Sequence, residues 1–220
     1  MNSQVLDNYD LVIFDCDGVL IDVNLLKCEA FGKAVEGYSS DLVVDFVDYC
    51  KKTFGVSRYI KFKEFFSEFA KEPFQEDKYQ LFLNIYSMLC KEAYSSAHIT
   101  PGCENLLMKL SNSNKRLFVA SGSDEQELIE VFDRKDLNKY FNGIYGSPKT
   151  KSENTSIILS NNPYKSGVFI GDAFSDMKTA KEYNLDFIYM SEYTVQSKEQ
   201  DQLCKDEAIL TIKTLRELFK

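Results

Sequence analysis

Residues 10–22 read DLVIFDCDGVLID, and the apolar run at 11–14 predicts a strand buried on both faces. The run leads directly into Asp15 and Asp17, two carboxylates one residue apart at the carboxyl end of that strand. In open α/β sheets this end is where ligands bind. Crowded carboxylates repel one another unless a cation or a shared proton compensates. Mg2+, a hard ion that prefers oxygen ligands, would do so, and Gly18 allows the sharp turn beside it.

Composition limits the possible functions. The chain has 220 residues, 44% of them hydrophobic, enough for a core domain and a smaller insert. A net charge of −8 without a basic run argues against nucleic-acid binding. No apolar stretch approaches the roughly 20 residues that span a bilayer, and the N-terminus lacks signal-peptide features. Six scattered cysteines therefore indicate a reduced, cytoplasmic protein. A single histidine, His98, argues against Ser-His-Asp catalysis.

The chain has two kinds of patterning. Residues 24–95 carry apolar side chains at helical spacing and predict four helices. From residue 99 onward, helical and strand patterns alternate, which is typical of a parallel sheet with helices on both faces. A last helix is expected around residues 215–219. The predicted strands after the first are 117–120, 143–145, 167–170, 187–190 and 208–212.

Polar side chains follow four of these predicted strands. The carboxyl ends of parallel strands meet at one edge of a sheet, so these groups are expected to lie together. Carboxylates would hold Mg2+, while a lysine and backbone N–H groups would hold a phosphate. Such a set fits phosphoryl transfer, which needs positioning and charge neutralisation. The groups are Asp15 with Asp17, Ser121 with Gly122, Lys149 or Lys151, and Asp172 with Asp176.

The motifs DCDGVL at 15–20, SGS at 121–123 and GDAFSD at 171–176, with the lysine segment, resemble those of the haloacid dehalogenase (HAD) superfamily. The resemblance implies an α/β fold with a Rossmann-like, doubly wound parallel sheet and an inserted α-helical cap. The implied division is a core of residues 1–22 and 96–220 and a cap of residues 23–95.

The resemblance also implies roles for the acidic residues. Asp15 would be the nucleophile that becomes an aspartyl phosphate. Asp17 would be the general acid and then the general base, and its backbone carbonyl would bind Mg2+. Asp172 would bind the metal directly, whereas Asp176 would act through water or by orienting its partners.

The phosphate would be held by other groups. Ser121 and the N–H of Gly122 are the expected donors. Lys151 is the favoured lysine, and Lys149 is the alternative.

The leading hypothesis is a Mg2+-dependent phosphatase that hydrolyses a small phosphorylated metabolite, such as a sugar phosphate or a phosphoglycolate-like compound. A phosphosugar mutase is the first alternative, with Lys27 as a candidate to hold a second phosphate. The alternative from another class is a phosphoacceptor or binding protein without turnover. The expected partner is the small substrate alone, without nucleic acid or membrane, and the chain is expected to be a monomer or a homodimer.

Overall fold

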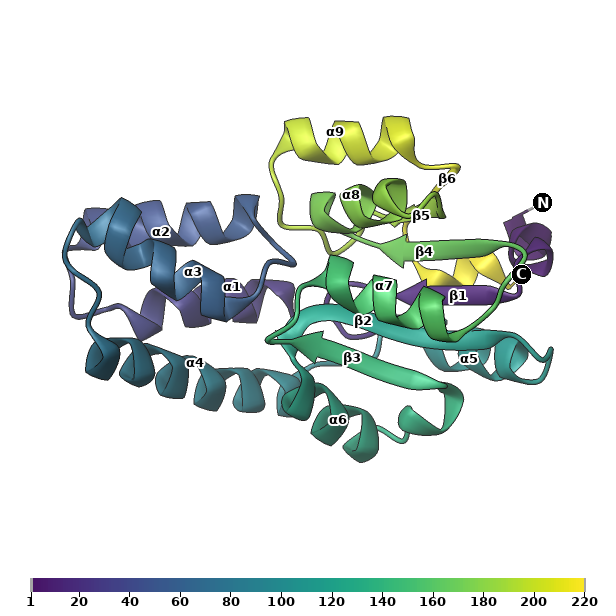
Figure 1. Cartoon of the computed structure of the whole chain (residues 1–220), viewed down its shortest axis with the longest axis horizontal. Coiled ribbons are helices and arrows are strands. Elements are labelled where there is room, and N and C mark those ends of the chain that lie inside the picture. Colours follow the sequence, from purple (N-terminus) through teal and green to yellow (C-terminus); the bar gives the residue numbers. More distant parts are fainter. Residues whose placement is uncertain (1, 220) are drawn as a thin grey trace.

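The computed structural model describes residues 2–219, with side chains described for residues 4–219. Within that part of the chain, six parallel strands form one sheet in the order β3-β2-β1-β4-β5-β6 (Figure 1). The predicted α/β class is therefore confirmed. The strands are β1 (Leu11–Phe14), β2 (Arg116–Asp124), β3 (Gly143–Ser147), β4 (Gly167–Gly171), β5 (Asp186–Met190) and β6 (Leu210–Ile212).

The central strand β1 explains the apolar run in the sequence. Val12 and Phe14 belong to the hydrophobic cluster on one face of the sheet, while Leu11 and Ile13 belong to the cluster on the other. All four are fully buried. Successive side chains of a strand point to opposite faces, so a strand covered on both sides must be apolar throughout.

Helices cover both faces of this sheet. The first face packs against α5 (Cys103–Ser111) and α6 (Glu125–Arg134). The second packs against α7 (Lys151–Asn161), α8 (Phe174–Glu182) and α9 (Lys198–Glu207). No helix in residues 2–219 combines the length and the apolar character needed to cross a membrane.

Some elements differ from the sequence-based predictions. Helix α9 was not predicted, because Cys204 is its only fully buried residue and the apolar periodicity is correspondingly weak. The predicted C-terminal helix is a 3-10 helix, Leu215–Leu218. Another 3-10 helix, Asn2–Asn8, precedes β1 and was not predicted.

The strand order reverses between β1 and β4, so the topological switch point of the sheet lies between these two strands. The connections on either side of a switch point leave in opposite directions, which opens a crevice at the carboxyl ends of the strands. The arrowheads of β3 and β4 in Figure 1 point toward the helices of the insert. The residues after β1 and β4 therefore lie between the sheet and these helices.

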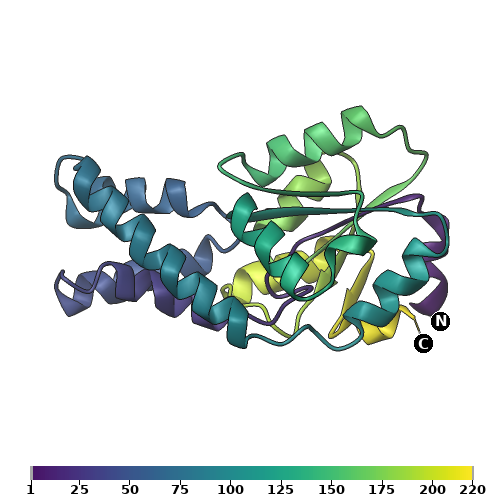
Figure 2. The ribbon, with the colours of Figure 1, turned by 90° about the horizontal axis from the view of Figure 1, so that it is seen from below.

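The insert is a helical cap with its own aromatic core. In this core the rings of Phe46 and Phe65 pack edge to face, with their centres 4.8 Å apart. Figure 2 shows the cap projecting from one end of the sheet domain. The last turns of its final helix reach the core, where Ala93 and Tyr94 join the main hydrophobic cluster. The domain boundaries at residues 22/23 and 95/96 stay a prediction. The cap elements are α1 (Asn24–Ala34), α2 (Ser40–Lys52), α3 (Arg58–Glu64), a π-helical segment (Phe65–Ala70) and α4 (Glu76–Ser96).

Candidate active site

Three carboxylates meet at the switch point of the sheet. Asp15 follows β1, Asp172 follows β4, and Asp176 lies in the first turn of α8. One oxygen from each lies within 4.8 Å of the others, and all three side chains are buried. Gly18 makes the close approach possible: its φ is +77°, and a Cβ there would lie 2.3 Å from Asp172 Oδ2 and from the Asn24 side-chain nitrogen.

This acidic cluster is short of positive charge. Asp15 Oδ1 and Asp172 Oδ1 are buried without a hydrogen-bond partner. Burial raises the pKa of Asp15 to about 7, and the charges of Asp176 and Asp17 add to the effect while Lys151 opposes it. Burial, with the neighbouring charges of Asp15 and Asp176, also raises the pKa of Asp172 well above its usual range. A hard cation bound by these oxygens would offset the repulsion, so the donor set fits Mg2+.

Asp176 differs from the other two carboxylates because its oxygens are occupied. Its Oδ2 accepts the backbone N–H groups of Asp172 at 3.1 Å and of Ala173 at 3.0 Å, which caps the start of α8. Its Oδ1 accepts a hydrogen bond from Lys151. This arrangement is compatible with the predicted indirect role of Asp176.

The two candidate lysines lie in different environments. Lys151 begins α7 and is buried, and its Nζ lies 3.3 Å from Asp15 Oδ1. Thr150 fixes this position as the N-cap of α7, in a reciprocal capping box with Glu153. Lys149 is exposed. The structure thus brings Lys151, and not Lys149, to the acidic cluster.

Ser121 and Gly122 lie near the end of β2 and line a small cavity together with Asp15 and Asp17. Ser121 is buried. A Cβ on Gly122 would lie 2.0 Å from the carbonyl oxygen of Gly55, which belongs to the loop between α2 and α3. The cap loop therefore closes directly over this part of the site.

The side chain of Asp17 faces the cap and does not join the acidic cluster. Lys27 Nζ, Ser123 Oγ and Tyr94 OH each donate a hydrogen bond to it at 2.6 Å. Burial alone would raise the pKa of Asp17, but the Lys27 charge and these hydrogen bonds hold it below its usual value. The expected metal contact through the backbone carbonyl of Asp17 stays a prediction.

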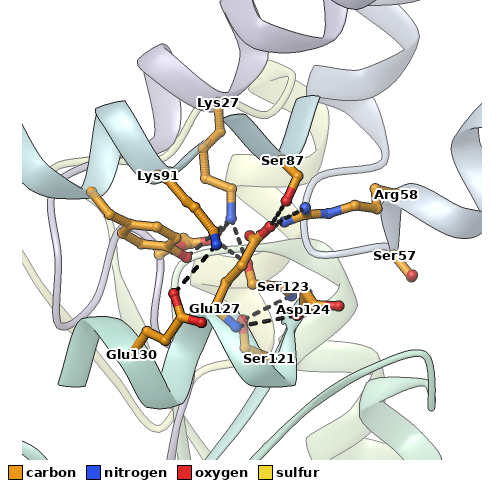
Figure 3. Close-up of polar contacts among 12 residues, drawn as sticks. Lys27, Ser57, Arg58, Ser87, Lys91, Ser121, Ser123, Asp124, Glu127 and Glu130 are labelled. Atoms are coloured by element: carbon orange, nitrogen blue, oxygen red, sulfur yellow. Dashed lines mark hydrogen bonds and ion pairs between the residues drawn. The ribbon is translucent and has the colours of Figure 1, made fainter. Parts of the chain in front are cut away.

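A second ion pair joins the cap to the core at the rim of the same cavity. Arg58 donates two hydrogen bonds to Glu127, at 2.7 and 2.5 Å, and its guanidinium lies 4.6 Å from the ring centre of Tyr86. Both partners are buried, and Ser87 also donates to Glu127. Figure 3 shows Arg58 and Ser87 converging on Glu127, with Lys27 beside Ser123.

Several of these contacts were not predicted from the sequence. Asn24 donates to Asp172 Oδ2 at 2.6 Å. The sequence offers Lys27 as a phosphate ligand or a solvated helix lysine, whereas the structure buries it beside Asp17. The contacts of Tyr94, Arg58 and Glu127 were not predicted. Ser123 could have been found, because it stands two residues from Ser121 and alternation places both on one side of β2.

The chain has the architecture of a capped α/β protein: a doubly wound sheet carries a carboxylate cluster at its switch point, and a helical cap lies over it. The chain belongs to the haloacid dehalogenase-like hydrolase family, whose sequence profile matches residues 12–190. The predicted family is therefore confirmed.

Individual relatives agree with this assignment. Over 141 residues the chain is 28% identical to a phosphorylated carbohydrates phosphatase of Thermotoga maritima, a match that covers 60% of this chain and 58% of that protein. The fold resembles a predicted phosphatase from Clostridium acetobutylicum, with a TM-score of 0.75, 22% identity and 96% of each chain covered. It also resembles a β-phosphoglucomutase from Clostridium difficile, with a TM-score of 0.76, 21% identity, and 95% and 92% of the two chains covered.

Proposed function

We propose that the protein is a Mg2+-dependent phosphatase that hydrolyses a small phosphorylated metabolite through an aspartyl phosphate. The observation that carries the proposal is the position of Asp15. Its Oδ1 lies 3.3 Å from Lys151 Nζ, and its carboxylate shares one buried cluster with Asp172 and Asp176. This cluster adjoins a cavity that Ser121 also lines. Further support comes from the relative that is named as a phosphatase of phosphorylated carbohydrates.

In the first step, a carboxylate oxygen of Asp15 attacks the phosphorus atom and the bond to the leaving oxygen breaks. Lys151, Ser121 and the N–H of Gly122 bind the phosphoryl oxygens and offset their charge. Lys149 is exposed and has no part in this step. Asp17 gives a proton to the leaving oxygen, so the product leaves as an alcohol.

In the second step, water attacks the phosphorus of the aspartyl phosphate, Asp17 takes its proton, and the bond to Asp15 breaks. Inorganic phosphate is released and Asp15 is restored. The contacts from Lys27, Ser123 and Tyr94 favour the charged form of Asp17, which is the form that a general base requires. Proton donation in the first step requires that the Lys27 contact loosen.

Mg2+ would be held by Asp15 and Asp172, with Asp176 behind them, and when bound it would neutralise charge on the phosphoryl group. Asn24 donates to Asp172 Oδ2 and so orients the other oxygen toward the cluster. The cap encloses the cavity and keeps bulk water away from the phosphoryl group.

The decisive experiment is a screen of phosphorylated metabolites, with and without Mg2+, on the natural protein and on Asp15→Asn. Loss of the nucleophile is expected to lower kcat/KM by at least about a thousandfold. Asp45→Asn is the matched control, because Asp45 is an exposed residue of the cap. Phosphatase activity unchanged by Asp15→Asn would exclude the proposed mechanism.

Two further measurements, turnover with an added sugar bisphosphate and phosphate retained on Asp15, separate the two alternatives. A phosphosugar mutase would be activated by a sugar bisphosphate. In the closed structure Lys27, the residue considered for its second phosphate, is already paired with Asp17. A phosphoacceptor protein would retain phosphate on Asp15 without turnover. Cytoplasmic location and the monomer or homodimer state stay predictions.

A further inference from the structure

Lys61 is a buried cation of the cap, and it has no role in the steps of the proposed reaction. It lies in α3 with 1% of its surface exposed. Its Nζ donates one hydrogen bond, to the backbone carbonyl of Cys50 at 3.0 Å. Among the residues that the structure describes, it forms no ion pair with a carboxylate. A buried ammonium group is costly unless a counter-charge accompanies it.

The other two buried cap cations differ in this respect. Lys27 is paired with Asp17 and Arg58 with Glu127. Lys61 has only partial compensation, from a carbonyl near the C-terminus of α2 and from two aromatic rings. Its Nζ lies 4.8 Å from the ring centre of Phe31 and 5.8 Å from that of Phe54. Burial accordingly lowers the pKa of Lys61.

Lys61 lines the same cavity as Asp15, Ser121 and Gly122. A phosphate ester bound with its phosphoryl group at Asp15 would extend its remaining atoms into this cavity, toward the cap. Phe31 and Phe54 also line the cavity and supply apolar walls but no charge. Among the cationic groups of the cavity wall, Lys61 is thus the one whose counter-charge is missing.

We propose that Lys61 is a specificity-determining residue that binds a second anionic group of the substrate, apart from the phosphoryl group that is transferred. The substrate class is then a compact phosphate monoester that also carries a carboxylate or a second phosphate. This inference rests on the proposed phosphatase function. A second anionic group would supply the counter-charge that the ammonium lacks, and an ester without one would leave the cation unpaired in the cavity.

The test compares pairs of probes that differ in one anionic group. D-3-phosphoglycerate and glycerol 3-phosphate differ by a carboxylate, and fructose 1,6-bisphosphate and fructose 6-phosphate differ by a phosphate. In one pair, the natural protein is expected to prefer the member with the additional anionic group by at least tenfold in kcat/KM. The pair that shows the preference identifies the group as a carboxylate or a phosphate.

Lys61→Met is expected to bring that ratio close to one, and Lys61→Arg to keep most of it. Lys63→Met, at an exposed position of the same helix, is the control and is expected to leave the ratio unchanged. The inference is overturned if the natural protein shows no kcat/KM preference in either pair of probes, an outcome that does not depend on whether Lys61→Met folds. It is also overturned if Lys61→Met folds and keeps the full preference.

Binding to the Asp15→Asn protein, measured by calorimetry, gives a readout that does not depend on turnover. If the probe with the additional anionic group binds at least tenfold more tightly than its partner without that group, the result supports Lys61 even if the protein is no phosphatase. Equal binding of both partners, or binding of neither, overturns the inference. Absence of Asp15-dependent turnover, in contrast, counts against the proposed function alone.

Discussion

The two walls of the cavity carry opposite charges. On the core side, Asp15 lines the cavity, and Asp172 and Asp176 lie behind it in the same acidic cluster. A single lysine, Lys151, pairs with Asp15 and Asp176. On the cap side the buried charged groups that line the cavity are cations: Lys27, Arg58 and Lys61. The core wall has one lysine for its three clustered carboxylates, and the cap wall has one cation without a carboxylate partner. Each wall therefore needs a ligand of the opposite sign, a metal ion on one side and an anionic substrate group on the other.

The walls also differ in how their side chains are held. The acidic residues follow strands of one sheet, and backbone hydrogen bonds such as that from Asp15 N to Ile170 O fix them. The cap cations stand on helices, and Lys27 and Arg58 reach the core through their ion pairs with Asp17 and Glu127. Under the proposed function, the sheet fixes the reaction chemistry and the cap selects the substrate.

The largest effect is expected from changing the acidic wall. Asp172→Asn should lower activity by at least about a thousandfold, since several kcal/mol of transition-state stabilisation would be lost with the metal. The same change removes a buried charge that Asp15 and Asp176 repel, so the metal-free variant should be more stable to urea than the natural protein. Activity assays and urea unfolding without metal measure the two effects.

Mg2+ distinguishes this explanation from a general packing effect. Millimolar Mg2+ should raise the Tm of the natural protein and of the surface control Asp45→Asn, but not that of Asp172→Asn. A variant that still gains stability from Mg2+ would show that Asp172 is not a ligand.

The next effect concerns the ion pair that joins the two walls. Arg58→Met leaves the Glu127 carboxylate buried without its partner, and should lower the free energy of unfolding by about 3 to 5 kcal/mol. The double variant Arg58→Met/Glu127→Met should recover much of that loss, because both charges are then absent. Urea unfolding of the single and double variants measures the coupling. Additive losses would mean that the pair is not coupled as the geometry indicates.

The core wall was predictable from the sequence and the cap wall was not. Asp15 and Asp172 follow short apolar runs, and strand ends of a parallel sheet share one edge, so their meeting follows from topology. The sequence favours Lys151 over Lys149 but leaves both open, because the choice depends on Thr150 being the N-cap of α7.

The cap residues offered no comparable signal. A lysine or arginine at a helical position, such as Lys61 or Arg58, has the same pattern whether it faces solvent or a cavity. Glu127 likewise resembles an ordinary acidic residue in the first turn of a helix. Only the packing of the cap against the core identifies these side chains as buried.

A smaller effect tests how closely the walls must approach. Gly122→Ala would place a methyl group 2.0 Å from the carbonyl oxygen of Gly55, so the cap loop would have to withdraw. A displacement of this kind should lower kcat/KM on the order of a hundredfold while the sheet stays folded. Gly37→Ala is the matched control, because a Cβ at that cap position meets no atom within 4 Å. Full activity of Gly122→Ala would show that this closed contact is not needed for turnover.

The smallest effect tests one hydrogen bond between the walls. Tyr94→Phe removes the hydroxyl that donates to Asp17 Oδ1 at 2.6 Å, while Lys27 and Ser123 still hold the other oxygen. A hydrogen bond to a buried charged group contributes about 1.5 to 3 kcal/mol, and the two remaining donors should keep the loss at the lower end of that range. We therefore expect kcat to fall about tenfold with little change in KM, because Asp17 acts on protons and does not bind the substrate. Tyr164→Phe, on the opposite face of the sheet, should change neither constant. A fall as large as that for Asp15→Asn would mean that Tyr94 itself takes part in the reaction, and the cap would then supply chemistry as well as specificity.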